Sequence, residues 1–482
     1  MEMKERKAKD IHINDALKSG VWYTVSNFAM KGIGFLTTPI FTRMMTKTEY
    51  GEFDNFQIWL LLLMYCTSLN LDASMIRALK DFREDKDSYM VSMISLYTLF
   101  TSVCWCISFC FRGVFGAVFS MDRVLIDCMF LYLLIFPAVQ LFQTRERFEF
   151  RYKRNIAIGM IVSVGSSLLS VVLILIMQNR LMARVIGFIL PSILVGAIII
   201  IWCARKGHIK VKYWKYALPI SLPVVPHLIS LYLLNSMDRI MIRDFYGKEQ
   251  MAMYALAYTC GMVITILFNS ANDAFAPWLA EKMHNEDYDS VRKVSIQYVM
   301  LFSFFAFMIV LVTPEILMVM GGDNYLEARY VMPPVTAGCL MQFVYTLYVN
   351  VETYEKKTVG MAIASVLTAI LNYVLNYIFI PRFGYVAAAY TTFVCYTVLL
   401  LFHMGLVKKI GMDKLYQNKK NCLFAGLFSV LIIMTSTIMD YALIRWSIEG
   451  ICIVLVLMTL LKKRGQFNSV FQRGTKKQDP GN

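Results

Sequence analysis

Long apolar runs alternate with short polar segments along the whole chain. The runs are about 20 residues long and lack the strict alternation of a β-strand, so each is typical of a helix that crosses a lipid bilayer. The pattern predicts fourteen spans, at 19–42, 54–74, 89–111, 124–143, 156–177, 182–203, 216–238, 252–274, 295–319, 329–350, 359–380, 385–407, 420–439 and 442–461. The segments between them are too short for a soluble domain. The expected fold class is therefore an all-α polytopic membrane protein.

Composition supports this interpretation. Of 482 residues, 58% are hydrophobic and only 17% are charged, against about 25% charged in soluble proteins. In lipid every backbone polar group must be satisfied internally, which favours helices. The eleven cysteines are scattered and form neither a disulfide framework nor a zinc motif. No cleavable signal is expected, so the first apolar run is interpreted as a retained helix.

The distribution of positive charge predicts the orientation. The net charge is +15, and Lys and Arg are concentrated in alternate loops. The N-terminus, the even-numbered loops and the C-terminus hold 35 of them, whereas the other loops hold 12. By the positive-inside rule the rich set is cytoplasmic. Both terminal segments, 1–18 and 462–482, are then cytoplasmic, and nucleic acid is not expected as a partner.

A short internal repeat suggests two related halves. The stretch Arg43–Gly51 follows the first span and Arg239–Gly247 follows the seventh, and four of nine positions are identical. Six spans separate them, so the halves share an orientation, as in many transporters with a site between two lobes. We expect pseudo-symmetric six-helix lobes at 19–203 and 216–407 and a terminal helix pair at 420–461. Chance similarity is the alternative.

The seventh span opens with three prolines. Pro219, Pro223 and Pro226 remove backbone donors from one helix face, so they kink or break the helix. A hinge in a moving helix and a static kink remain equal alternatives.

Polar side chains recur at helical spacing along one face of several spans. The stripes comprise Thr24, Asn27, Lys31 and Thr38; Asp54, Gln57, Tyr65, Ser68 and Asp72; His227, Ser230 and Asp238; Tyr258, Thr265, Asn269 and Asn272, with Asp273 beside them; Gln342, Tyr345, Tyr348 and Glu352; and Ser365, Thr368, Asn372 and Asn376. A polar stripe has no reason to face lipid, so we expect these faces to line a water-filled cavity between the lobes. The alternative is that they pack and hydrogen-bond between helices.

Lys31 is the most informative ionisable residue. It lies near the middle of the first span, where a charged amine costs at least ~2.5 kcal/mol. Binding an anionic substrate and pairing with an acid are the two alternatives. Arg43 and Arg239 lie nearer the outer interface and could equally be snorkelling anchors. The full set of candidate substrate-binding residues is Asn27, Lys31, Arg43, Asp72, Arg77, His227, Asp238, Arg239, Asn269, Asn272 and Gln342.

Several catalytic motifs are missing from the sequence. There is no Gly-x-x-x-x-Gly-Lys-[Ser/Thr], His-Glu-x-x-His or Gly-x-Ser-x-Gly sequence, and the five histidines do not cluster. The chain is therefore not expected to be an enzyme. A membrane glycan polymerase or acyltransferase would be expected to have a long outer loop or an intramembrane His beside an acid. His227 is too isolated in the sequence to support that alternative.

Several loose motifs, in their order and spacing, resemble one family. They are Lys31, Thr42-Arg43 through Glu49-Tyr50-Gly51, Pro219, Asp238-Arg239, Ala276-Pro277, and Asn372 through Thr391 with its Asn-x3-Asn and Pro-x2-Gly pattern. The chain resembles, over nearly its whole length, the polysaccharide transporters, that is the O-antigen and capsule repeat-unit flippases, of the MOP exporter superfamily. It departs from the pattern at Val386-Ala387, where a second Gly is common, which puts close helix packing in doubt.

The resemblance implies a substrate, a mechanism and a location. Undecaprenyl pyrophosphate carrying a short oligosaccharide would move from the inner to the outer leaflet of a bacterial cytoplasmic membrane by alternating access. Membrane lipids, a polysaccharide polymerase and assembly proteins are the further partners it suggests, without a cofactor. The energy source of transport stays open. Asp72, Asp273 or Glu352 could bind Na⁺ or H⁺, or the membrane potential alone could act on the charge of the substrate. A drug/cation antiporter of the same superfamily is the main alternative. Such an antiporter would be expected to have an acidic cavity, and the positive charge of Lys31 argues against it.

Overall fold

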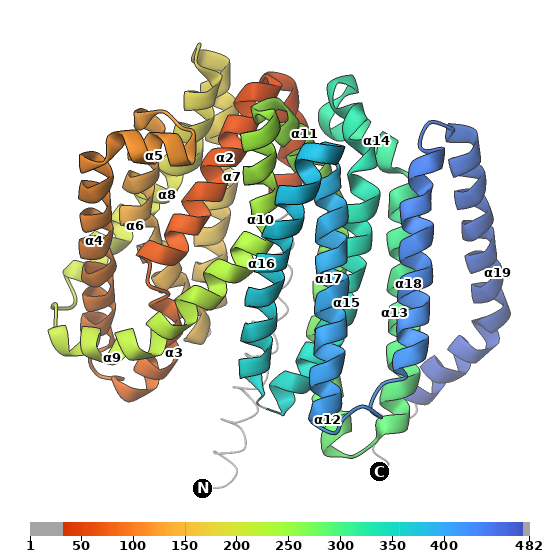
Figure 1. The fold of residues 1–482 in the computed structure, drawn as a ribbon. Helices are drawn as coiled ribbons and strands as arrows, with labels where there is room; N and C mark the ends of the chain where they lie inside the picture. The colour runs from red at the N-terminus through yellow and green to blue at the C-terminus, as the bar shows by residue number, and fades with distance from the viewer. Residues whose placement is uncertain (1–31, 150, 356, 476–482) are drawn as a thin grey trace, which may run out of the picture.

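The computed structural model describes residues 32–149, 151–355 and 357–475, and every regular element in these ranges is a helix (Figure 1). The first part contains a helix at 32–44, α2 (Lys47–Thr67), α3 (Asp72–Asp81), α4 (Lys86–Cys110), α5 (Arg112–Phe119), α6 (Arg123–Phe148), α7 (Tyr152–Ile176), α8 (Arg180–Ala204) and α9 (Val211–Ser221). A 3-10 turn, η1 (Leu222–Val224), joins α9 to the rest.

The second part is also helical. It contains α10 (Val225–Tyr246), α11 (Lys248–Gly261), α12 (Ile264–His284), α13 (Tyr288–Leu311), α14 (Thr313–Gly321), η2 (Asp323–Tyr330), α15 (Met332–Tyr354), α16 (Thr358–Phe383), α17 (Ala387–Lys409), α18 (Asn418–Met434), η3 (Thr435–Ile438) and α19 (Ala442–Thr475).

Nine helices of the described residues are long and apolar enough to cross a membrane, or up to eleven if two bent pairs count as single spans. An all-helical polytopic membrane protein is thus confirmed. The predicted span 19–42 lies mostly outside the described residues. The predicted span 329–350 is present as α15, which does not meet the same test of apolar content. Its first ten residues are all buried, so it packs inside the protein and needs less apolar surface toward lipid.

The helices pack as two bundles (Figure 1). We call α2 to α9 the first bundle and α10 to α18 the second bundle. Two apolar clusters form the core of the first bundle, and a single large cluster that includes Met332, Tyr348 and Leu399 forms the core of the second. The principal contacts between the bundles are those of α2 with α10 and α11. In Figure 1 this contact lies at the end of the molecule opposite the α12–α13 turn.

The proline-rich segment differs from the single span predicted at 216–238. It folds as α9, the 3-10 turn and α10, with a bend of 41° between Val211–Ser230 and Tyr232–Tyr246. The α9 helix packs against α3 and α4, and its Tyr213 and Ala217 belong to a core cluster of the first bundle. Residues of α9 that were expected in the second lobe therefore contact the first bundle, because the chain bends only after Ser230, beyond α9.

Candidate functional site

The contact between the bundles lies where the two repeated stretches, Arg43–Gly51 and Arg239–Gly247, end. Gly51 on α2 is buried, and a Cβ atom on it would lie 2.2 Å from the carbonyl oxygen of Lys248. Beside this contact the Lys248 amino group pairs with Glu52 at 2.7 Å, and the Thr48 hydroxyl donates to Glu249 at 3.3 Å. The end of the first repeated stretch and the start of α11, which follows the second stretch, therefore meet at one end of the molecule.

An ion pair lies below this contact. The Arg239 guanidinium on α10 is 3.2 Å from the Asp54 carboxylate on α2, and each side chain is only 16% exposed. Asp238, next to Arg239, is buried and accepts a hydrogen bond of 2.5 Å from the Tyr254 hydroxyl. One Asp54 oxygen and the Arg239 Nε are buried without a hydrogen-bond partner. The pair thus joins the two bundles but leaves polar atoms unsatisfied.

Three further hydrogen bonds join the bundles at the same end. Arg243 on α10 donates to the side chain of Asn55 on α2 at 2.6 Å, and also to the carbonyl oxygen of Phe119 at 3.0 Å. The Tyr232 hydroxyl donates to the carbonyl oxygen of Ile58 at 2.9 Å. None of these three contacts needs a bound ligand.

The helix at 32–44 is held by α14. The Thr42 hydroxyl donates to the carbonyl oxygen of Met320, and the Arg43 guanidinium donates to that of Met318 at 3.2 Å. Arg43 was predicted to bind substrate, but its guanidinium lies at this contact and it does not line either polar cavity described below.

A cavity of about 340 Å³ adjoins the ion pair. Its lining comes from the helix at 32–44 and from α10, α11 and α12, and includes Thr38, Arg239, Tyr258 and Ile266. The Arg239 guanidinium lies 5.6 Å from the centre of the Tyr258 ring. The cavity therefore presents one cation, an aromatic ring and hydroxyl groups, which suits an anionic group attached to a polar molecule.

A second, smaller cavity of about 30 Å³ lies between α12 and α15. Asn269, Asn272 and Gln342 line it together with Thr265 and Thr346. These three amides were predicted from two different spans, and the structure brings them together.

The other predicted residues have separate outcomes. Asn27 and Lys31 lie outside the described residues, as does the side chain of His227. Asp72 is half-buried at the first position of α3, and Arg77 is exposed on the same helix. Neither lines the two polar cavities.

The polar stripe of span 11 packs against a neighbouring helix. Asn372 and Asn376 on α16 are fully buried, and they form hydrogen bonds to Thr392 and Thr391 on α17. Asn376 also donates to Asn372 at 3.1 Å. For these two asparagines the interhelical alternative is correct, and we do not assign them to the cavity.

One buried polar pair was not predicted. His403 on α17 and Glu352 on α15 are 2% and 0% exposed, and the imidazole Nδ1 is 2.9 Å from the carboxylate. The Tyr345 ring stacks on the imidazole with centroids 5.4 Å apart. Glu352 belonged to a predicted stripe, but His403 belonged to none, and nothing in the sequence around His403 marks a partner 51 residues away.

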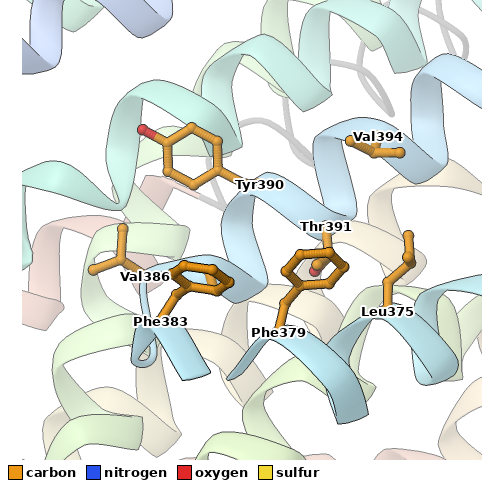
Figure 2. Close-up of a pocket in the computed structure, with 8 residues that line it drawn as sticks. Leu375, Phe379, Phe383, Val386, Tyr390, Thr391 and Val394 are labelled. Carbon is orange, nitrogen blue, oxygen red and sulfur yellow. The ribbon is translucent and has the colours of Figure 1, made fainter. Parts of the chain in front are cut away.

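An apolar groove of about 440 Å³ lies between the ends of α16 and α17 (Figure 2). Phe379, Phe383 and Tyr390 line it, and all three are exposed. Figure 2 shows the two phenylalanine rings beside each other on α16. Exposed aromatic rings suit contact with lipid chains, so this groove is not a candidate for a polar substrate.

Comparisons with known proteins agree with this architecture. A family model described as "Polysaccharide biosynthesis protein" matches residues 16–283, more than half of the chain. A protein of the Lsg locus of Haemophilus influenzae is 22% identical over 377 residues, which cover 73% of this chain and 88% of that protein.

Solved structures share the fold. Lipid II flippase MurJ in an inward closed conformation is similar with a TM-score of 0.67 and 15% identity, over 93% of this chain and 100% of MurJ. A multidrug resistance MATE family transporter of the MOP superfamily in an inward-facing conformation is similar with a TM-score of 0.56 and 12% identity, over 81% and 95% of the two chains.

Proposed function

The chain belongs to the polysaccharide biosynthesis protein family, and we propose that it is a flippase for lipid-linked oligosaccharide. The substrate would be undecaprenyl pyrophosphate that carries a short repeat unit, moved from the inner to the outer leaflet for surface polysaccharide synthesis. MurJ, which shares the fold, is named for flipping another lipid-linked molecule.

The observation that carries this proposal is the position of Arg239. A diphosphate must cross about 30 Å of hydrocarbon, and charged groups there need compensation. Arg239 places a guanidinium at the wall of a cavity of about 340 Å³, and a guanidinium is the side chain best suited to bidentate contact with phosphate. We propose that Arg239 exchanges Asp54 for the diphosphate during transport. Lys31 is proposed as a second cation for the same group.

Alternating access would use the contact between the bundles as a gate. By the positive-inside rule, the end with the α12–α13 turn faces the cytoplasm, so the closed end faces outward. We propose that the two bundles move as lobes about the proline turn at 222–224. Under this proposal the structure is an inward-facing state. Outward opening then requires the Gly51–Lys248 contact and the Asp54–Arg239 pair to separate.

Deleting the protein from its cell tests the function directly. Undecaprenyl-pyrophosphate-linked oligosaccharide should accumulate on the cytoplasmic leaflet, and surface glycan should fall. Complementation with Arg239→Gln should not restore export, whereas Arg292→Gln should, because Arg292 lies on α13 and pairs with the exposed Asp289. Normal glycan together with altered drug sensitivity would favour an antiporter and refute the flippase.

A further inference from the structure

Arg184 in the first bundle is held by aromatic rings instead of a carboxylate. It lies on the second turn of α8 and is half-buried. Its guanidinium carbon is 3.4 Å from the centre of the Phe41 ring and 4.5 Å from that of the Phe53 ring. Within the described ranges, no residue accepts a hydrogen bond from this guanidinium or forms an ion pair with it. Its five N–H donors are therefore available to another partner.

Anchoring at the membrane surface does not explain the position of Arg184. Arg180, one turn earlier on α8, is exposed and donates to the carbonyl oxygen of Met44 at 2.7 Å, as expected of a snorkelling side chain. Arg184 instead lies against Phe41 and Phe53, which belong to a core cluster of the first bundle. A charged side chain inside a membrane helix is unfavourable unless it is compensated, and cation–π contacts supply only part of that compensation. A carboxylate partner in another state of the protein would supply the rest.

The Asp54 carboxylate is suited to be that partner. Asp54 directly follows Phe53 on α2, and α2 packs against α8 within the first bundle. Tyr50, one turn earlier on α2, interacts electrostatically with both Asp54 and Arg184. One Asp54 oxygen pairs with Arg239, and the other is buried without a hydrogen-bond partner. Asp54 therefore lies between a cation of the second bundle and a cation of the first.

We propose that Arg184 takes over Asp54 when Arg239 leaves it for the diphosphate. This inference rests on the proposed function. Once Arg239 binds phosphate, Asp54 would otherwise remain inside the protein as an unpaired charge, which is strongly unfavourable. A change of rotamer moves the Arg184 guanidinium from the phenylalanine rings to Asp54. The ion pair between the bundles is thereby replaced by one within the first bundle, and the bundles can separate.

Arg184 is a positioning residue in this exchange and does not contact the substrate. It does not line the cavity that contains Arg239. Its contribution to transport is therefore expected to depend on the charge of Asp54, whereas a direct contact with the diphosphate would act whether or not Asp54 is charged.

Binding of a diphosphate lipid to the purified full-length chain tests the exchange. The probe is a short polyprenyl diphosphate without a sugar, and the measured quantity is its Kd. Arg184→Met keeps a long side chain that packs between the two rings and removes the charge. It should weaken binding about tenfold, which is the effect of one hydrogen-bonded charge, because the release of Asp54 from Arg239 is no longer compensated.

The same change should have no effect when Asp54 is neutral. Asp54→Asn has no carboxylate to release, so it should bind the probe at least as tightly as the wild-type chain. Adding Arg184→Met to Asp54→Asn should then change the Kd less than twofold. A purely structural role of Arg184 would weaken binding by the same factor in both backgrounds. The matched control is Arg180→Met, one turn earlier on α8, which should bind like the wild-type chain.

The possible results separate this exchange from the proposed function. A tenfold loss that persists in the Asp54→Asn background overturns the exchange, and so does an Arg184→Met variant that binds like the wild-type chain. Arg184→Gln should show the same pattern and replaces Arg184→Met if that variant does not fold. Failure of the wild-type chain to bind the probe overturns the proposed function and the exchange with it. Loss of binding in Arg239→Gln, with normal binding in Arg184→Met, overturns the exchange alone.

Discussion

Gly51 and Lys248 meet so closely that no side chain can replace the hydrogen of Gly51 without separating α2 from α11. A Cβ atom on Gly51 would lie 2.2 Å from the Lys248 carbonyl oxygen, and backbone atoms cannot rotate away as a side chain can. Overpacking of this kind typically costs 1–3 kcal/mol. We predict that Gly51→Ala shifts the equilibrium away from the closed state by about tenfold. Hydrogen exchange in 46–58 and 246–256 should become faster.

The control for Gly51→Ala is a glycine with free space around it. Gly405 on α17 has no atom within 4 Å of an added Cβ, so Gly405→Ala should leave exchange in both segments unchanged. Unchanged exchange in Gly51→Ala would show that the contact between the turns does not hold the bundles together.

The sequence predicted this end of the molecule better than its interior. The repeated stretches could be found by comparing the chain with itself, and the structure places Lys248, the residue after the second stretch, against Gly51 at the end of the first. The partner of Arg239 could not be found in that way, because Asp54 is 185 residues away. A helical stripe predicts which face of a helix is polar, but not which other helix that face meets. Asn372 and Asn269 have the same pattern, and only the packing of α16 against α17 separates their roles.

The Asp54–Arg239 pair provides a second test of closure. Removing one partner of a fully buried ion pair costs about 3–5 kcal/mol, and the 16% exposure of these side chains lowers the expected loss to about 2 kcal/mol. Asp54→Asn and Arg239→Gln should each lower the thermal stability of the purified protein. The double variant should lose less than the sum, because both changes remove one interaction. Additive losses would show that the two charges act independently.

The His403–Glu352 pair should stabilise the second bundle. Both groups are buried, and one Glu352 oxygen has no hydrogen-bond partner. Glu352→Gln keeps the shape of the side chain and replaces its carboxyl group with an amide. We predict a loss of about 2–4 kcal/mol for Glu352→Gln or for His403→Phe, measured by thermal unfolding. Glu281→Gln, which changes an exposed acid on α12, should have little effect. If Glu352→Gln is as stable as this control, the pair is not structural.

The attachment of α9 to the first bundle should depend on pH. Lys210 hydrogen-bonds the Asp85 carboxylate, as do Ser88 and the Tyr213 hydroxyl, and these bonds hold the pKa of Asp85 well below its usual value. A lowered folded-state pKa stabilises the folded protein above the unfolded-state pKa of about 3.9. This contribution is lost as the pH falls from that value through the folded-state pKa. Lys210 and Tyr213 flank the start of α9, so the same bonds fix one side of the proposed hinge.

Asp85→Asn removes that contribution at neutral pH. At pH 7 hydrogen exchange in 205–216 should become a few-fold faster than in the wild-type protein, because the loop before α9 opens more often. Asp289→Asn, which changes a side chain that is 92% exposed, should leave that exchange unchanged. The difference between Asp85→Asn and wild type should narrow once the pH falls below about 4. A difference that stays constant from pH 7 to pH 3 would mean that the Asp85 charge does not hold α9, and the hinge would then need another anchor.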